Sequence, residues 1–286
     1  MTVSVVIVNW NAGEALVRAV ASVRQHAGGV ELVVVDNGSD DGSLAAARAR
    51  HAELVVVETG TNLGFASGAN RGAAVATGEV LVFLNPDAEL LPGALTGLTE
   101  ALVRWPDAGI AGGGLCDPDG RWQPGAAYFG PLRHLVCDST VGRLWVRRHA
   151  PSRVDWVYGT FMAVRRDLFV RLGGFDQRYF LYGEDMDLCD RARALGALTV
   201  HVPAARALHA RNVSARQRFG DGRDAEVMKG EMRFYAWRRG RGALRLFRCG
   251  ALLKLSVKAV LASLAGRARV AAVSRQVVRT CWSFQP

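Results

Sequence analysis

Residues 80–90 read Val-Leu-Val-Phe-Leu-Asn-Pro-Asp-Ala-Glu-Leu. The first five are apolar, as in a fully buried β-strand, and Pro86 cannot extend a hydrogen-bonded ladder. A buried strand that ends at a carboxylate is typical of open α/β sheets, which bind ligands beside the carboxyl ends of their strands. We therefore expect Asp87 to hold a divalent cation against an anionic ligand such as a diphosphate, although Asn85, Pro86 and Asp87 are also ordinary turn formers.

On both sides of this run, apolar stretches alternate with segments of helical periodicity. The predicted strands are residues 3–8, 31–35, 54–58, 80–84 and 109–115, and the predicted helices are residues 14–25, 43–49, 65–76 and 92–105. Pro92 suits the first position of the last of these helices. This order predicts an α/β fold with a mostly parallel sheet.

The pattern becomes less regular after residue 115. Residues 116–121, Cys-Asp-Pro-Asp-Gly-Arg, predict the turn of a hairpin. Residues 124–152 lack clear periodicity and are expected to form a mobile loop region, with or without a role in substrate binding. A second ordered block is expected over residues 154–202, ending in a helix at residues 184–195 and a strand at residues 198–202.

The composition permits a large buried core and favours a reducing compartment. Half of the 286 residues are hydrophobic and 22% are charged. The five cysteines are an odd number and none are spaced as a metal knuckle, which argues for reduced thiols and against a disulfide framework. No basic segment precedes the short apolar run at residues 3–8, so the sequence offers no secretory signal there. We expect a cytoplasmic protein.

Positive charge is concentrated in the C-terminal part of the chain. Residues 1–215 hold 20 Lys and Arg against 22 Asp and Glu, whereas residues 216–286 hold 16 against 4. We expect residues 1–215 to form one domain and residues 216–286 a basic helical extension. Lys254 and Lys258 interrupt its apolar run, so the extension is amphipathic and too polar to span a bilayer. It is expected to lie on an anionic membrane surface, at the inner face of the cell membrane, or to pack back on the domain.

Three further segments place polar or small residues at strand ends or helix starts. Asp36 ends the second strand, where an ionised carboxylate would accept the N3–H of uracil or thymine, unless it only caps the next helix. Residues 62–72, Asn-Leu-Gly-Phe-Ala-Ser-Gly-Ala-Asn-Arg-Gly, open a helix whose free N–H groups suit phosphate or sugar oxygens, and whose glycines equally suit close packing on a sheet. Residues 9–13 after the first strand lack the Gly-x-Gly-x-x-Gly of a dinucleotide site, which disfavours a dehydrogenase.

The chain also offers a candidate base and a candidate histidine ligand. Residues 183–191 read Gly-Glu-Asp-Met-Asp-Leu-Cys-Asp-Arg, and acids at a helix start complement the helix dipole. If one of these carboxylates points into a cleft, it is a general base whose pKa the neighbouring acids raise. Arg191 is spaced to pair with Asp187 one turn earlier. His209 would complete a metal shell or contact a diphosphate, although a lone histidine is more often structural.

Taken together and in order, these segments resemble glycosyltransferase family 2, and within it the bacterial rhamnosyltransferases that use dTDP-rhamnose. The resemblance covers residues 2–215. It is carried by Val-Ile-Val-Asn-Trp-Asn at 6–11, Asp-Asn-Gly-Ser at 36–39, residues 62–72, Leu-Asn-Pro-Asp at 84–87, Gly-Gly-Phe-Asp at 173–176 and Gly-Glu-Asp-Met-Asp-Leu at 183–188. The resemblance implies a GT-A fold, which is a Rossmann-like sheet flanked by helices, and an inverting, metal-dependent transferase.

The resemblance also implies roles for individual residues. Asp185 resembles the catalytic base, and Glu184 a neighbour that shapes the acceptor site. Asp87 resembles the ligand for Mg²⁺ or Mn²⁺, with His209 as a further ligand for the metal or the diphosphate. The residues expected to bind the nucleotide-sugar are Asn9, Asp36, Asn37, Asn62, Gly64, Asn70, Asn85, Trp156 and Gly159. This chain departs from the family in two places, because Asn85 replaces the usual first acid of the metal motif and no Gly-rich sequence follows His209.

The implied reaction transfers a sugar, with L-rhamnose from dTDP-rhamnose as the first choice, to a hydroxyl of a cell-surface glycan, a lipid-linked glycan or a secondary metabolite. A UDP-sugar donor carrying galactofuranose or an N-acetylhexosamine is an alternative, because Asp36 cannot distinguish thymine from uracil. A third interpretation is a non-catalytic nucleotide-sugar sensor or a nucleic-acid-binding protein. The tail lacks the closely interleaved aromatic residues of a single-strand platform, so no nucleic acid partner is expected.

Overall fold

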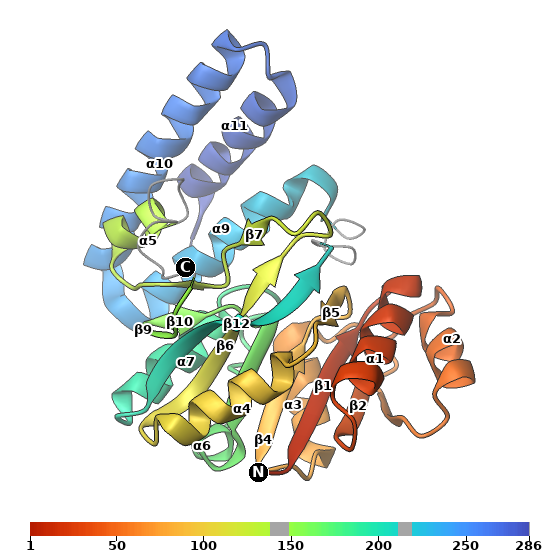
Figure 1. Cartoon of the computed structure of the whole chain (residues 1–286). Helices are drawn as coiled ribbons and strands as arrows, with labels where there is room; N and C mark the ends of the chain where they lie inside the picture. Colours follow the sequence, from red (N-terminus) through yellow and green to blue (C-terminus); the bar gives the residue numbers. More distant parts are fainter. Residues whose placement is uncertain (138–148, 211–218, 286) are drawn as a thin grey trace.

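The computed structural model describes residues 1–137, 149–210 and 219–285. A central sheet carries helices on both faces, and a helical hairpin formed by the last two helices projects away from it (Figure 1). The strands are β1 (Val3–Asn9), β2 (Glu31–Asp36), β3 (Val55–Glu58), β4 (Val80–Leu84), β5 (Ala88–Leu90), β6 (Ala108–Cys116), β7 (Trp122–Gln123), β8 (Ala126–Ala127), β9 (Ser152–Val154), β10 (Trp156–Val157), β11 (Phe161–Arg165) and β12 (Leu198–His209).

The helices of the domain are α1 (Glu14–His26), α2 (Ser43–Arg50), α3 (Phe65–Val75), α4 (Ala94–Arg104), α5 (Pro131–Cys137), α6 (Arg166–Arg171) and α7 (Glu184–Ala194). Up to residue 116 the predicted strands and helices are all present, with ends shifted by at most two residues. The prediction that Pro92 begins its helix was wrong. The Ala94 N–H donates to the Leu91 carbonyl at 3.0 Å and Gly93 has φ 75°, so Pro92 lies in a turn that precedes α4.

The main sheet follows the order β3-β2-β1-β4-β11-β6-β12-β5. Strands β1 to β4 pair in parallel and so do β6 and β12, whereas β11 runs antiparallel between β4 and β6. Strand β12 is longer than the predicted strand at residues 198–202. After a register shift between Val202 and Arg206 it continues to His209, which pairs with Ala88 of β5. This pairing brings His209 beside Asp87.

Both faces of the sheet are covered, which explains why its strands are almost continuously hydrophobic. Because successive strand residues point to opposite faces, Val5 and Ile7 join the cluster under α1 and α4, whereas Val6 and Val8 join the cluster under α3 and α7. A Cβ on Gly68 or Gly72 of α3 would collide with valines of β1 and β2. The glycines of residues 62–72 therefore permit close helix–sheet packing, one of the two uses that the sequence suggested.

Residues 116–137 are ordered more regularly than predicted. The hairpin turn at residues 116–121 is confirmed, because the Asp117 N–H donates to the Arg121 carbonyl at 2.9 Å and β7 pairs with β6. The prediction of an irregular loop at residues 124–152 is wrong for the described part of that segment, which contains β8, α5 and the start of β9. Within it, His134 is only 3% exposed. Residues 138–148 of that segment lie outside the described residues.

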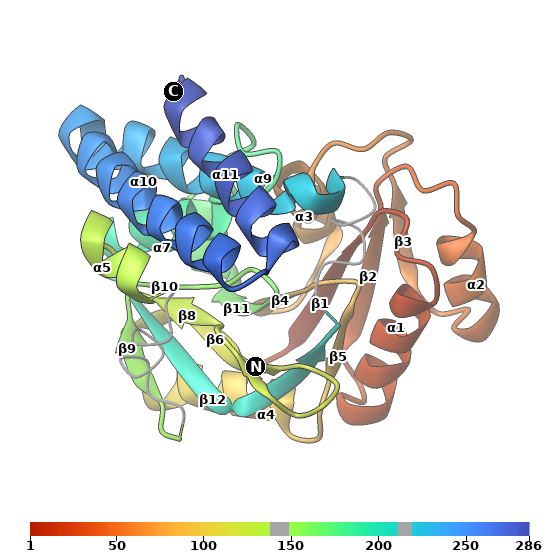
Figure 2. The ribbon, with the colours of Figure 1, turned by 90° about the horizontal axis from the view of Figure 1, so that it is seen from above.

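The tail is helical, as predicted. It comprises α9 (Arg223–Phe234), the π-helical turn η3 (Tyr235–Arg239), α10 (Gly240–Leu264) and α11 (Ala268–Ser283), and α10 and α11 lie side by side (Figures 1 and 2). Phe234, Tyr235 and Phe247 are fully buried in the cluster that also holds Phe83 of β4, so the base of the tail packs on the domain. The predicted boundary at residue 215 lies outside the described residues. No described helix is both long and apolar enough to cross a bilayer.

Candidate active site

A pocket with a volume of about 650 Å³ lies between the strand ends of the sheet and the helices of the tail. This volume is in the usual range of small-molecule sites. The residues of the sequence-predicted site that line it are Asn37, Asn62, Gly64, Asn85, Asp87, Trp156, Gly159, Glu184, Asp185 and His209. Three other predicted residues, Asn9, Asp36 and Asn70, do not line it.

Asp87 and His209 face each other in this pocket. His209 Nε2 lies 3.4 Å from Asp87 Oδ1, and both side chains are at least nine-tenths buried. On the other side of the imidazole, Nδ1 lies 3.1 Å from Gln123 Oε1, while Gln123 Nε2 donates to the His209 carbonyl at 2.9 Å. Because the amide oxygen of Gln123 can only accept, the neutral imidazole carries its proton on Nδ1. In this neutral form, His209 Nε2 presents a lone pair toward the carboxylate.

Asp185 lies in the first turn of α7, where two backbone N–H groups hold its carboxylate. Its Oδ1 accepts from Met186 N–H at 2.8 Å and its Oδ2 accepts from Gly159 N–H at 3.1 Å. The helix begins after Gly183, which has φ 95° and whose Cβ would lie 2.8 Å from the Gly230 carbonyl of α9. A glycine is therefore required at that position, and the carboxylate that follows it is fixed in orientation.

The two adjacent acids differ in their readiness to ionise. Burial raises the pKa of Asp185 to about 6, while the N–H groups of Gly159 and Met186 oppose the rise. Burial and the neighbouring Asp185 raise the pKa of Glu184 well above its ordinary value of 4.5. Glu184 Oε2 is buried without a hydrogen-bond partner among the described residues. Glu184 therefore favours its protonated form, and Asp185 is the member of the pair that ionises near neutral pH.

Asn37, in the loop after β2, and Asn62 and Gly64, in the loop before α3, line the pocket and are joined by hydrogen bonds. Asn37 Nδ2 donates to Asn62 Oδ1 at 3.2 Å and to the Gly64 carbonyl at 3.1 Å, and its Oδ1 accepts from Leu63 N–H at 3.1 Å. Gly64 has φ 83°, and a Cβ there would collide with the Phe180 carbonyl. The side chain of Asn37 is thus occupied in fixing the shape of this loop.

Asn9 and Asp36 are buried, and each is adjacent in the sequence to a residue that lines the pocket. Asn9 is fully buried and its Nδ2 donates to Asp36 Oδ1 at 2.8 Å, while Ser39 N–H donates to Asp36 Oδ2 at 3.0 Å. Asn9 therefore positions the carboxylate of Asp36, and its contact with the nucleotide-sugar stays a prediction.

Asn70 also lies outside the pocket, on α3. Its Nδ2 donates to the Phe175 carbonyl at 2.8 Å and its Oδ1 accepts from Phe175 N–H at 2.9 Å. The amide thus joins α3 to the loop before α7, and the expected contact of Asn70 with the nucleotide-sugar stays a prediction.

Gln123, His134 and Glu231 line the pocket but were not singled out in the sequence. His134 Nε2 lies 3.3 Å from Glu231 Oε1 on α9, and the Trp156 ring lies against the imidazole at 5.6 Å between centroids. His134 belongs to the segment that the sequence suggested was irregular. The role of Gln123 depends on the pairing of β7 with β6, which no local motif specifies.

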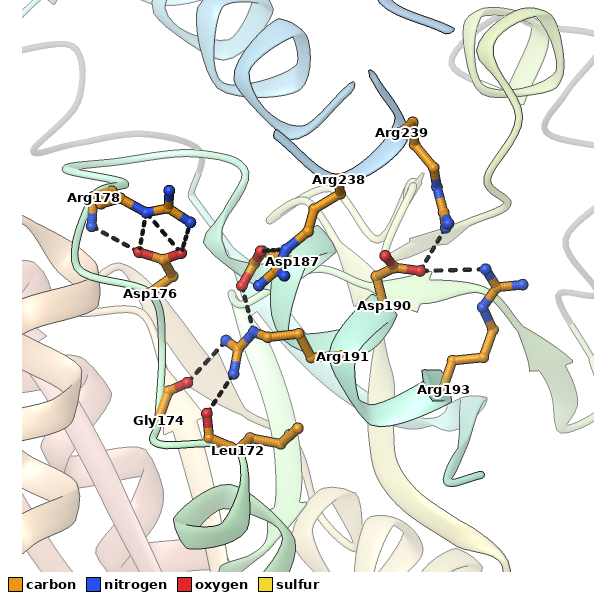
Figure 3. Close-up of polar contacts among 10 residues, drawn as sticks. All are labelled: Leu172, Gly174, Asp176, Arg178, Asp187, Asp190, Arg191, Arg193, Arg238 and Arg239. Carbon is orange, nitrogen blue, oxygen red and sulfur yellow. Dashed lines mark hydrogen bonds and ion pairs between the residues drawn. The ribbon is translucent and has the colours of Figure 1, made fainter. Parts of the chain in front are cut away.

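Helix α7 is also where the tail attaches (Figure 3). Asp187 is fully buried and pairs with Arg191 at 2.7 Å, as the sequence predicted, and with Arg238 of η3. The neighbouring Arg239 of η3 pairs with Asp190. Two arginines of the tail therefore hold the helix that carries the candidate base.

Residues 4–172 match the family model described as "Glycosyl transferase family 2". The chain belongs to glycosyltransferase family 2. This family 2 enzyme is 36% identical over 230 residues to the N-acetylglucosaminyl-diphospho-decaprenol L-rhamnosyltransferase of Mycobacterium tuberculosis, an alignment that covers 72% of this chain and 75% of that protein. The predicted family is thus confirmed, and the enzyme is close to rhamnosyltransferases.

Solved structures of other glycosyltransferases share the fold of this family 2 enzyme. The mannosyltransferase PcManGT from Pyrobaculum calidifontis, in complex with GDP-Man and Mn²⁺, has a TM-score of 0.63 at 18% identity, over 99% of this chain and 88% of that one. GalNAc-T7 with UDP, GalNAc and Mn²⁺ has a TM-score of 0.60 at 21% identity, over 84% of this chain and 50% of that one. These likenesses confirm the predicted GT-A architecture.

Proposed function

We propose that this enzyme is an inverting, metal-dependent rhamnosyltransferase that transfers L-rhamnose from dTDP-rhamnose to a hydroxyl of a lipid-linked N-acetylhexosamine diphosphate. The observation that supports the proposal is that one pocket is lined by Asp185, whose pKa burial raises to about 6, and by Asp87 and His209, whose Oδ1 and Nε2 atoms face each other. The choice of sugar and acceptor rests on the similarity to the mycobacterial rhamnosyltransferase.

The donor atoms of Asp87 and His209 fit Mg²⁺ or Mn²⁺. His209 Nε2 is buried, has no hydrogen-bond partner among the described residues and lies 3.4 Å from a carboxylate oxygen. Two acceptor atoms at this distance repel each other unless a cation or a proton lies between them. Because the described residues contain no cluster of three or more His, Cys, Asp or Glu ligands, the donor diphosphate and water would supply the remaining ligands, as is usual for Mg²⁺. A cation here would offset the charge that develops on the leaving diphosphate.

Asp185 takes the proton of the acceptor hydroxyl in this mechanism. Each of its oxygens accepts one backbone N–H and keeps a lone pair for the acceptor. With a pKa of about 6 the carboxylate is ionised at neutral pH, yet it is a stronger base than an ordinary aspartate. Attack opposite the leaving diphosphate inverts the anomeric carbon. Glu184, which burial keeps protonated, adds no second negative charge and offers a hydrogen-bond donor to a sugar hydroxyl.

Recognition of the pyrimidine by Asp36 remains a prediction. Asp36 immediately precedes Asn37, which lines the pocket, and each of its oxygens accepts one hydrogen bond and keeps a lone pair. Asp36→Ala is expected to weaken binding of dTDP at least tenfold, and unchanged affinity in calorimetry would remove Asp36 from the nucleotide site.

The test of the proposed function is a transfer assay on the whole chain with Mn²⁺. dTDP-rhamnose, UDP-galactofuranose and UDP-N-acetylglucosamine are each offered with farnesyl-diphosphate-linked N-acetylglucosamine, and the product is analysed by mass spectrometry and by NMR of the new anomeric centre. We expect transfer of rhamnose alone, with inversion, and its loss in EDTA. Transfer from a UDP-sugar would replace the proposed donor, and an absence of any product would refute the proposal.

We also propose that the outer side of α10 rests on an anionic membrane surface at the cytoplasmic side, where a lipid-linked acceptor is presented. Five exposed apolar residues recur at whole helical turns and form one stripe: Leu246, Leu253, Val257, Val260 and Leu264, at 48–81% exposure. Residues 240–286 hold nine Lys and Arg and no Asp or Glu. Apolar insertion combined with cationic side chains is how interfacial helices bind lipid.

Vesicle sedimentation tests this surface. The enzyme is expected to sediment with vesicles that contain phosphatidylglycerol, and a variant with Leu253→Ser, Val257→Ser and Leu264→Ser is expected to stay in the supernatant. Equal sedimentation of the two proteins would exclude the stripe as the docking surface.

A further inference from the structure

We infer that Glu231 of α9 binds a hydroxyl group of the acceptor sugar, and that His134 of α5 holds the carboxylate of Glu231 in place. The inference rests on the proposed function, because it assigns a contact to the acceptor of that reaction. Glu231 lines the pocket that also holds Asp185. Its side chain is 18% exposed, so a ligand in the pocket can reach the carboxylate.

Close packing of α9 on the start of α7 places Glu231 near the candidate base. A Cβ on Gly183 would lie 2.8 Å from the Gly230 carbonyl, and a Cβ on Gly230 would collide with the Tyr182 carbonyl. Glu231 is the next residue after Gly230, and Asp185 is the second residue after Gly183. Burial is the main cause of the raised pKa of Asp185, and the charge of Glu231 also raises it. A sugar whose hydroxyl reaches Asp185 is therefore expected to lie close to Glu231 as well.

His134 contacts the carboxylate of Glu231 and is itself held by aromatic neighbours. Its Nε2 lies 3.3 Å from Glu231 Oε1, and its Nδ1 lies 3.1 Å from the hydroxyl of Tyr235. An ionised carboxylate only accepts hydrogen bonds, so the neutral imidazole carries its proton on Nε2 and accepts from Tyr235 at Nδ1. The ring is buried and packs against Trp156 and Phe247. A carboxylate has about four lone-pair sites, so this contact leaves Glu231 able to accept from a ligand.

A carboxylate at this place favours an uncharged ligand that carries hydroxyl groups. It would repel a diphosphate, whereas sugar hydroxyls donate the hydrogen bonds that it accepts, and an ionised acceptor makes such bonds roughly twice as strong. Glu184 lines the same pocket, and its buried Oε2 has no hydrogen-bond partner among the described residues, which indicates that a polar ligand completes this part of the pocket. In the proposed mechanism the attacking hydroxyl lies at Asp185. Glu231 therefore suits a second hydroxyl of the same sugar.

The experiment removes one hydroxyl at a time from the acceptor. Farnesyl-diphosphate-linked N-acetylglucosamine and its analogues that lack the hydroxyl at C3, at C4 or at C6 are titrated into the whole chain with Mn²⁺ and dTDP, which carries no sugar to transfer. Calorimetry in neutral detergent gives each Kd. One analogue is expected to bind the wild type at least about tenfold more weakly than the parent acceptor, because it lacks a hydrogen bond to a charged group. In Glu231→Ala, that analogue and the parent acceptor should bind equally, because the partner of the hydroxyl is gone.

Two further variants complete the comparison. Glu231→Gln keeps the size of the side chain and a neutral acceptor atom, so its discrimination should lie between those of the wild type and Glu231→Ala, and it tests the inference even if the alanine variant does not fold. Glu226→Gln makes the same change on α9, at a carboxylate that pairs with Lys229 at 2.6 Å and is not among the residues that line the pocket. It should leave every Kd at its wild-type value. The Kd of dTDP reports on folding and should be the same in all four proteins.

The positioning role of His134 is tested in the same assay. His134→Phe keeps a ring against Trp156 and Phe247 but donates nothing to Glu231. Discrimination against the deoxy analogue should fall about threefold, the scale of one neutral hydrogen bond. His134→Gln, whose amide can donate to Glu231, should recover most of it. Full discrimination in His134→Phe would overturn the positioning role.

Two results would overturn the contact between Glu231 and the acceptor. If each analogue loses the same affinity in the wild type and in both Glu231 variants, Glu231 binds no acceptor hydroxyl. If Glu231→Gln raises the Kd of dTDP-rhamnose but not that of dTDP, the carboxylate belongs to the donor sugar.

The transfer assay separates this inference from the proposed function. If no rhamnose is transferred but the loss of one hydroxyl weakens binding only when Glu231 is present, the proposed function fails and the acceptor contact stands. If rhamnose is transferred and the loss is independent of Glu231, the acceptor contact fails and the proposed function stands.

Discussion

Asp185→Asn is predicted to stabilise this enzyme at pH 8 while removing its turnover. The pKa of the Asp185 carboxyl is raised from 3.8 to about 6 by burial, so the folded protein holds this proton more tightly than the unfolded chain does. The stabilisation that this raised pKa gives the folded protein is therefore fully present below pH 3.8, and it is lost as the pH rises to about 6. The difference between the two pKa values corresponds to about 3 kcal/mol, at about 1.4 kcal/mol for each tenfold change in proton affinity.

An asparagine at position 185 does not lose stability as the pH rises, because its side chain is uncharged at every pH. Its amide oxygen can accept from either Gly159 N–H or Met186 N–H, and the other N–H then faces the amide NH₂, which costs about 1–2 kcal/mol. The net result is a variant that is about 1–2 kcal/mol more stable than the wild type at pH 8 and less stable than the wild type at pH 4. Its turnover should fall at least about 100-fold, the scale of a general base.

Urea denaturation of both proteins between pH 4 and pH 8 measures this effect. The difference in the free energy of unfolding should change by about 2 kcal/mol over that range, mostly below pH 6. Stability curves that run parallel would refute the assigned pKa, and normal turnover in the variant would refute Asp185 as the base. Binding of dTDP serves as the folding control and should be unchanged.

Three further predictions concern the metal pair, the pH profile and the tail. Asp87→Ala should abolish the gain in dTDP-rhamnose affinity on adding Mn²⁺, measured by calorimetry, and a wild type indifferent to EDTA would contradict the metal assignment. Wild-type kcat/KM should fall tenfold per pH unit below about pH 6, where Asp185 becomes protonated, and a profile that is flat down to pH 5 would contradict that role. Arg238→Ala removes one of the two partners of the buried Asp187 and should lower the free energy of unfolding by about 1–3 kcal/mol. If urea denaturation finds no loss, Arg191 alone is a sufficient partner.

The fold of residues 3–116 could be predicted because its signals are local. The run from Val80 to Leu84 is apolar throughout, and it is buried on both faces. Strand β12 shows where local signals fail. The apolar run stops at Pro203, but the strand resumes through the register shift before Arg206, because β6 and β5 supply partners that lie far away in the sequence.

The same contrast holds in the pocket. Asp87 and His209 could be proposed because each follows a strand, and the carboxyl ends of parallel strands lie at one edge of a sheet. Gln123, which holds the imidazole, lies 86 residues from His209, and no spacing rule connects them. The resemblance implies that Asn9 and Asn70 contact the nucleotide-sugar, and this role stays a prediction. Only the tertiary structure shows that their amides bond to Asp36 and Phe175.

The arginines of η3 have a consequence for exchanging parts between related transferases. Consider a hybrid that keeps residues 1–215 and receives its last helices from another enzyme. Asp187 is fully buried, so it would lack one of its positively charged partners unless the new sequence also had arginine at position 238. Those helices therefore cannot be exchanged alone without a loss of stability. Residues 184–190 and 235–239 would have to be moved as one cassette.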